Sequence, residues 1–429
     1  MAVSATDVRA RTEADSAAAV NDWRMWVPCL GMALCSWLSF VDRQVLNILS
    51  PTIIADTGLT AQDFTTATSF FFLTYTLGNP VWGSVLDYVG LRRGMLLAVG
   101  VWTIASMSHA AMSSFAGFAL ARAVLGLGEG GTFPGGLRTA VESLPATMRA
   151  RGIALSFSGG TIGAVMMPLL LGPLAIQYGW RIAFLATGAL GVAWLFIWAA
   201  IARPPFLPAN PPRAAKMAFP DLTERRTWAL IFSYALPAIS PGPVLTILAI
   251  YLSQRLRLTQ GDVNNLVWIP PLTWGIGYFF WGWAADKFAA GNRRPVGMFL
   301  LLTIASLTLG AVTWTTSPGV AIALIGFSTF IGGGFQMVAL KVGSYAFPRE
   351  QSALMSGIAS GSWSLVNFVL LNAIGAGVTI GSVRLFPGAN WIAAQRWEEI
   401  FWLIAILPAV GIAAWLLLSR NEVNRGARV

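Results

Sequence analysis

Charged residues are scarce in this chain of 429 residues, since Asp, Glu, Lys and Arg together make up only 11% of it. A soluble domain carries about 25% charged residues, which cover its surface. Hydrophobic residues account for 56% of the chain, with 19 Trp and 25 Phe. The composition therefore excludes an ordinary soluble domain and indicates a protein that exposes most of its surface to lipid.

Histidine and cysteine, which most often bind metals or support catalysis, are nearly missing. The chain has one His, His109, and two Cys, Cys29 and Cys35. Both cysteines are expected in the first helix, ~9 Å apart along its axis, beyond the reach of a disulfide. The sequence has no metal-ligand cluster and no nucleophile paired with a base, so we expect no enzyme, no catalytic residues, no metal and no cofactor.

Long apolar tracts recur along the chain, and many reach the ~20 residues that cross a bilayer core. Two clear examples are 182–202 and 400–419. Their polarity does not alternate as in barrel strands, so helices are the expected way to satisfy the backbone in lipid. The pattern predicts an all-α membrane protein with twelve transmembrane helices.

A polar, proline-rich segment divides these tracts into two sets of six. Such a segment is typical of a linker between two membrane bundles. In chain order, the predicted parts are an N-terminal tail, a six-helix bundle, a linker, a second six-helix bundle and a C-terminal tail: 1–23, 24–202, 203–226, 227–419 and 420–429. The eleventh helix is expected at 353–379.

The net charge of +10 could suggest nucleic acid, but the positions of the basic residues argue against that partner. Most of the 28 Lys and Arg fall in the loops on one side of the predicted helices, including the linker. The positive-inside rule then places both termini and the linker in the cytoplasm. We expect a multi-pass protein of a bacterial inner membrane, most simply a monomer in the lipid bilayer.

The two halves share a motif at the same spacing. Gly78, Trp82, Gly83 and Asp87 in the first half recur as Gly277, Trp281, Gly282 and Asp286, and each copy is followed by two arginines. Duplication of a six-helix unit is the build expected of a transporter whose substrate site lies between the halves.

The loop at 83–93 reads Gly-Ser-Val-Leu-Asp-Tyr-Val-Gly-Leu-Arg-Arg. It resembles the signature between helices two and three of the major facilitator superfamily, Gly-x-x-x-Asp-Arg/Lys-x-Gly-x-Arg-Arg, and departs from it at Tyr88. The resemblance implies two pseudo-symmetric bundles that rock about a central site. An aspartate at a helix end can pair with arginines of neighbouring helix ends, so we expect a conformational latch at Gly83, Asp87, Arg92, Arg93, Gly282 and Asp286.

A more specific resemblance is to the anion:cation symporter family, which includes hexuronate and galactonate carriers. Three stretches carry it: Phe-Val-Asp-Arg-Gln at 40–44, Arg-Ala-Val-Leu-Gly-Leu-Gly-Glu at 122–129 and Tyr-Gly-Trp-Arg at 178–181. The likeness is good from about residue 30 to 200 and fades beyond the linker.

Four ionisable residues fall inside predicted spans: Asp42 and Arg43 in the first, Arg122 and Glu129 in the fourth. Charges in the hydrocarbon cost several kcal/mol unless paired or wetted, so these residues are functional candidates. Counting along the helices places them at similar depths, and we expect them to share one water-filled chamber. A purely structural salt bridge between Asp42 and Arg122 is the alternative.

In that chamber Arg122 can neutralise Asp42 or Glu129, but not both. Arg43, about 100° round the helix from Asp42, can point separately and bind a substrate carboxylate. The family resemblance implies that Asp42 and Glu129 accept protons, that Arg43 contacts the anion and that Tyr75 hydrogen-bonds it.

Hexuronate-type relatives usually have asparagines where this chain has Thr132, Phe157 and Thr161. We expect Thr132, Thr161 and Asn367 to contact substrate, in a cavity with fewer amides than those relatives have. Fewer amides could favour a less hydroxylated carboxylate.

The sequence thus predicts a proton-coupled importer of a small organic anion that works by alternating access. Hexuronates and other sugar acids are the first expected substrates, and aromatic or aliphatic monocarboxylates the second. An exchanger or exporter on the same fold and a membrane sensor that does not transport are the alternatives.

Overall fold

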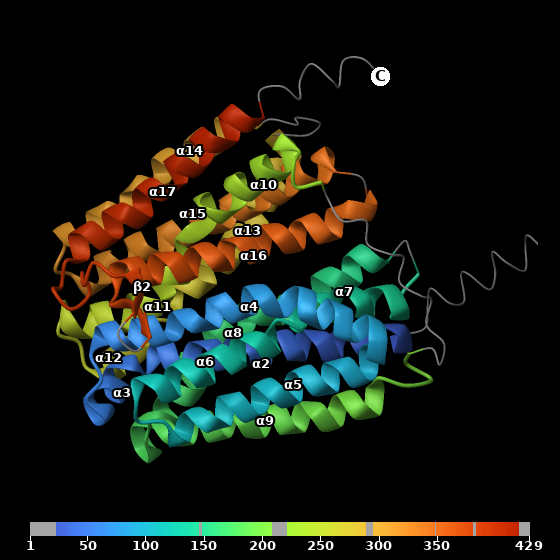
Figure 1. Ribbon diagram of the computed structural model, residues 1–429, viewed down its shortest axis with the longest axis horizontal. Coiled ribbons are helices and arrows are strands. Elements are labelled where there is room, and N and C mark those ends of the chain that lie inside the picture. The colour runs from blue at the N-terminus through green and yellow to red at the C-terminus, as the bar shows by residue number, and fades with distance from the viewer. Residues whose placement is uncertain are drawn as a thin grey trace, which may run out of the picture.

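The computed structural model describes residues 23–145, 148–207, 221–288, 295–347, 349–380 and 383–419. Long helices run side by side, with the N-terminal half in the lower part of Figure 1 and the C-terminal half above it. The predicted tails except Trp23, most of the linker and Arg293-Arg294 lie outside the described residues.

The N-terminal half consists of helices in an apolar sequence. After the short η1 (Trp23–Trp26) come α2 (Val27–Ile48), α3 (Ser50–Thr57), α4 (Ala61–Val89), α5 (Leu91–Ser108), η2 (His109–Ala111), α6 (Phe115–Glu129), α7 (Thr132–Ser143), α8 (Arg149–Tyr178) and α9 (Trp180–Ile201). The predicted fourth span is therefore broken into α6 and α7 at Gly130 and Gly131.

The C-terminal half repeats the arrangement with its own interruptions. It contains α10 (Arg225–Ala235), η3 (Pro237–Ile239), α11 (Pro241–Gln254), α12 (Gln260–Leu266), α13 (Ile269–Phe288), α14 (Val296–Ser306), η4 (Leu307–Trp314), α15 (Pro318–Ala346), α16 (Arg349–Ile374), β1 (Gly377–Ile380), β2 (Val383–Pro387) and α17 (Trp397–Leu418). Within the described residues, nine helical segments are long and apolar enough to cross a membrane.

The predicted C-terminal end of the eleventh helix is wrong. The helix predicted at 353–379 stops at Ile374, and an antiparallel hairpin of β1 and β2 follows. Gly377 has a φ of +78°, a conformation that ends a helix. The β-branched run from Val378 to Ile380 then favours a strand. We call the end of the molecule with this hairpin, α3 and α12 the hairpin end, and the opposite end the linker end (Figure 1).

The internal repeat extends to helix starts and helix contacts. Thr60 and Asp63 form a capping box that begins α4, and Thr259 and Asp262 form another that begins α12. The repeated glycines also share one role. A Cβ on Gly78 would lie 2.6 Å from the Leu127 carbonyl oxygen, and one on Gly277 would lie 2.5 Å from that of Phe330. Both glycines therefore allow close contact between neighbouring helices.

The contact between α4 and α6 is especially close. A Cβ on Gly126 would lie 2.2 Å from the Phe71 carbonyl oxygen, and one on Gly130 would lie 2.6 Å from the carbonyl carbon of Gly78. Only glycine fits at such distances, because a side chain would push one backbone away from the other. The two helices thus pack backbone to backbone.

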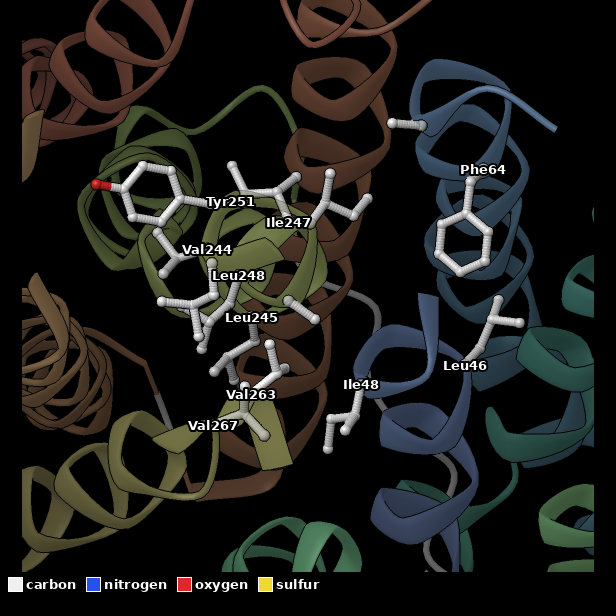
Figure 2. Close-up of a cluster of buried hydrophobic side chains, with 14 of the residues drawn as sticks. Leu46, Ile48, Phe64, Val244, Leu245, Ile247, Leu248, Tyr251, Val263 and Val267 are labelled. Atoms are coloured by element: carbon white, nitrogen blue, oxygen red, sulfur yellow. The ribbon is translucent and has the colours of Figure 1, made fainter. Parts of the chain in front are cut away.

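The apolar core joins the two halves at the hairpin end. Its largest cluster combines residues of the N-terminal half, such as Leu46, Ile48 and Phe64, with residues of the C-terminal half, such as Val244 and Leu248. Figure 2 shows the two groups on neighbouring helices. The remaining clusters of described residues belong to one half each. The halves are therefore packed together most extensively at the hairpin end.

Candidate transport site

A cavity lies between the two halves. Eight of its lining residues come from α2, α4 and α6: Phe40, Arg43, Gln44, Asn47, Thr68, Phe71, Phe72 and Arg122. The others come from α11, α13 and α16: Pro241, Gly242, Leu245, Thr246, Trp274 and Trp363. The space open to the centre of a water molecule is about 40 Å³. Since roughly 10–15 Å³ of such space holds one water, the cavity in this conformation admits a few waters.

Arg43 forms an ion pair with Glu129 across the helices α2 and α6. Its Nε donates to Glu129 Oε2 at 2.5 Å, and the Glu129 side chain is completely buried. The guanidinium also lies over the rings of Phe40, Phe71 and Tyr75, at 4.9, 4.9 and 4.7 Å from their centroids. Arg43 is therefore held by a carboxylate and three aromatic faces.

Arg122 is the unpaired cation of the site. It is 1% exposed, and its Nε and Nη2 have no hydrogen-bond partner among the described residues. The expected pairing is therefore reversed: Arg43 is bound to a carboxylate, and Arg122 lines the cavity without a salt bridge in the described part of the chain. The reason is local geometry, because α2 turns Arg43 toward α6, where Glu129 lies.

Asp42 points away from the cavity, into the N-terminal half. Ser106 of α5 donates a hydrogen bond to Asp42 Oδ1 at 2.7 Å, and Thr187 of α9 lies 3.1 Å from the Ser106 hydroxyl. Neither Asp42 nor Glu129 lines the cavity, so the expectation that all four charges meet in one chamber holds for the two arginines only. Sequence reasoning missed Ser106 and Thr187, since hydroxyls in apolar helices give little signal.

The four other residues expected to contact substrate lie in four different environments. Tyr75 stacks on Phe71, with 5.6 Å between the ring centroids. Thr132 is buried, and its hydroxyl has no hydrogen-bond partner in the described part of the chain. Thr161 packs on α13, where its Cγ2 would lie 2.2 Å from a Cβ on Gly275. Asn367 lies behind Gly242, with Oδ1 1.8 Å from where a Cβ of Gly242 would be. None of the four lines the cavity itself.

Gln44 and Asn47 are cavity residues that sequence reasoning missed. They stand one turn apart on α2, beside Arg43. Polar residues spaced by three positions in an apolar span mark one polar helix face, and that signal was present in the sequence.

Two of the expected latch residues, Asp87 and Asp286, form equivalent ion pairs at the linker end. Arg138 of α7 donates to Asp87 at 2.7 Å and to Glu142 at 2.5 Å. Lys341 of α15 donates to Asp286 at 2.8 Å, at the corresponding place in the second half. Each aspartate thus pairs with a cation that lies inside another helix, Arg138 in α7 or Lys341 in α15. Arg92 instead donates to the Ala199 carbonyl at 3.0 Å, and Arg93 is exposed. A Cβ on Gly83 or Gly282 would meet nothing within 4 Å.

Hydrogen bonds join the two halves at the hairpin end. Thr52 contacts Gln260 at 2.9 Å, Gln62 contacts Asn390 at 2.8 Å, and Asn372 donates to the buried Ser69 at 2.7 Å. Together with the shared apolar core, these bonds hold the two halves against each other at this end.

Comparison of the sequence with protein families identifies the class of protein. The model of the Major Facilitator Superfamily matches residues 32–371. The chain belongs to this superfamily of membrane transporters, and the all-α fold expected from the sequence is confirmed. The number of spans stays a prediction.

Two relatives with established names fit the narrower resemblance. The hexuronate transporter of Escherichia coli (strain K12) is 22% identical in an alignment of 386 residues that covers 84% of this chain and 89% of that protein. The D-galactonate transporter of Escherichia coli O6:H1 is 25% identical in an alignment of 353 residues that covers 75% of this chain and 81% of that protein. The resemblance to sugar-acid carriers is therefore confirmed, and the chain is a transporter, not an enzyme.

A solved structure shows the same fold. It is a bacterial homolog of the human lysosomal transporter Spinster, in an inward-facing and unoccupied conformation. The TM-score is 0.73 at 18% identity, and the match covers 94% of this chain and 98% of the other.

Proposed function

We propose that the chain is a proton-coupled symporter that takes up a small organic anion by alternating access. The observation that carries the proposal is the buried, unpaired guanidinium of Arg122 in a central cavity, beside the ion pair of Arg43 and Glu129. A buried guanidinium whose N–H donors lack partners is costly in a membrane interior, and a carboxylate ligand supplies the missing acceptors.

The charges of the site explain why a proton would accompany the anion. Two carboxylates and two guanidinium groups balance one another when the cavity contains only water. An incoming carboxylate adds negative charge in a medium of low dielectric, which favours protonation of Asp42 or Glu129. A protonated Glu129 would also release Arg43, so that both arginines could bind the anion.

The contacts at the hairpin end indicate which side of the membrane the cavity is closed to in the proposed cycle. If the basic loops are cytoplasmic, the hairpin end faces outside, and the contacts there are those of a state closed to the outside. Opening of the hairpin end would break bonds such as that between Thr52 and Gln260 and expose the same cavity. In this way the two halves rock about one fixed site.

The first substrate class to test comes from the relatives. Their names specify hexuronate and galactonate, and sugar acids are accordingly the first candidates for this chain. Aromatic or aliphatic monocarboxylates are the second candidates, because aromatic and apolar side chains form most of the cavity wall.

Uptake in proteoliposomes tests the function. With an acidic exterior, the purified chain is expected to accumulate a radiolabelled anion of one of these classes, and collapse of the pH gradient by an ionophore should release it. Accumulation driven outward would indicate an exporter. Ligand binding without any flux would indicate a sensor, and either result would contradict the proposal.

Cross-linking tests alternating access. With Cys29 and Cys35 replaced by alanine, Thr52→Cys and Gln260→Cys joined by a short bifunctional reagent should hold the hairpin end closed. Transport is expected to fall at least about tenfold and to recover when the link is cleaved. The control pair is Asp56→Cys with Arg181→Cys, two residues of one half whose side chains form an ion pair at 2.7 Å. A link there should leave transport unchanged, and equal inhibition by both links would argue against rocking halves.

A further inference from the structure

The polar groups of the cavity lining that lack a hydrogen-bond partner among the described residues lie on one side only. Arg122 has two nitrogen atoms without partners among the described residues, and Asn47 Oδ1 is likewise unpartnered. Gln44 lines the cavity next to them. All three residues belong to the N-terminal half. This side can therefore bind a carboxylate and at most a few further polar atoms close to it.

The polar groups of the opposite wall are already bonded within the protein. Trp274 Nε1 donates to Gln336 at 3.1 Å, and Trp363 Nε1 donates to the Ala238 carbonyl at 2.7 Å. The Thr246 hydroxyl donates to the Gly242 carbonyl at 2.9 Å. The free oxygen of Asn367 lies behind Gly242, outside the lining. The C-terminal half thus offers the ligand mainly rings and aliphatic surface.

Aromatic pairs span the cavity from one half to the other. Phe40 lies 6.3 Å from Trp274, and Phe72 lies 6.0 Å from Trp363, measured between ring centroids. Leu245 completes the apolar wall. A flat or branched apolar group that packs beside these rings would contact both halves at once.

We infer that the preferred substrate is a small monocarboxylate with an apolar body, aromatic or branched aliphatic, and not a polyhydroxylated sugar acid. The inference rests on the proposed function, since it names the substrate class of the same site. The carboxylate binds Arg122, and the body packs on Trp274, Trp363 and Leu245. A sugar acid in this pose would bury several hydroxyls against a wall with no free partner, and each unmatched hydroxyl weakens binding. The site then differs in specificity from the sugar-acid relatives.

Paired substrates test the inference. The full chain in proteoliposomes with an acidic exterior is given radiolabelled phenylacetate, isovalerate, glucuronate or galactonate at equal concentrations. Uptake by protein-free liposomes is subtracted, because protonated apolar acids cross bilayers unaided. We expect saturable uptake of phenylacetate or isovalerate at least about tenfold faster than that of either sugar acid. Excess glucuronate should not compete.

The opposite outcomes are separable. Saturable uptake of glucuronate or galactonate without uptake of the apolar acids would overturn the substrate class and leave the proposed function intact. Saturable uptake of none of the four would overturn both.

A variant of the apolar wall supplies a second test. Leu245→Asn places an amide where the structure has an aliphatic side chain and should raise the KM for phenylacetate about tenfold while lowering the KM for glucuronate. Leu245→Met keeps the wall apolar at similar volume and should change neither KM more than about twofold. If Leu245→Asn changed both KM values in the same direction, the wall would not set specificity and the inference would fail.

Discussion

Replacement of Arg122 by glutamine is expected to lower anion uptake at least about 100-fold. Two charge-assisted hydrogen bonds of about 1.5–3 kcal/mol each would be lost, and each 1.4 kcal/mol is a factor of ten. Arg122 Nε and Nη2 have no hydrogen-bond partner among the described residues, so the variant breaks no native hydrogen bond of these two atoms. We therefore expect Arg122→Gln to fold, with unchanged helical content by circular dichroism and a thermal midpoint at least as high as that of the parent.

Two further variants show whether geometry or charge matters at this position. Arg122→Lys retains the charge but not the planar pair of N–H donors, and an intermediate uptake rate is expected. Arg181→Gln is the matched control. Hydrogen bonds from Arg181 and Trp180 lower the pKa of Asp56, but the Arg181 pair lies on the surface and should leave uptake within about twofold. Normal uptake by Arg122→Gln would exclude this guanidinium as the anion site.

Replacement of Glu129 by glutamine is expected to abolish accumulation driven by a pH gradient while it preserves exchange of anion for anion. Glutamine keeps the shape and can still accept the hydrogen bond from Arg43, but it cannot take up or release a proton. The measurement is uptake against a concentration gradient, compared with counterflow in vesicles preloaded with unlabelled anion.

The control for this variant is Glu399→Gln at the start of α17. Glu399 is paired with Arg396 at the hairpin end, away from the cavity residues, and both activities should persist. If Glu129→Gln still accumulated anion in response to acid outside, proton coupling would have to be assigned to another group, with Asp42→Asn the next variant to measure.

Much of the architecture could be predicted because lipid imposes simple rules. Low charge content, long apolar tracts and the repeated Gly-Trp-Gly-Asp motif were enough to predict helices in two related halves. The hairpin after α16 was missed, because Ala373 to Ile380 continues the apolar tract of the preceding span with one hydroxyl residue, Thr379. The glycines and the β-branched run within it are too short a signal to place the end of the helix.

The sequence singles out the four charged residues of the membrane interior, but it does not predict how they pair or which other residues line the cavity. Charges inside apolar spans single out Asp42, Arg43, Arg122 and Glu129 without any structure. Which arginine binds which carboxylate depends on helix rotation and on a break in the fourth span, and a turn of a few tens of degrees changes the partner. The aromatic wall was missed for a related reason: in a chain with 19 Trp, composition alone does not separate Trp274 and Trp363 from those that face lipid.

The backbone contact between α4 and α6 should fix the distance between these two helices during transport. Phe71 and Phe72 lie on α4, and Arg122 lies on α6. Because glycines hold these two helices in backbone contact, the aromatic face of the cavity and Arg122 should move as one rigid unit. A pair of spin labels placed on these two helices should report one narrow distance throughout the cycle. A pair divided between α4 and α16 should report two, and the ratio of their populations would then read out directly how each anion biases the cycle.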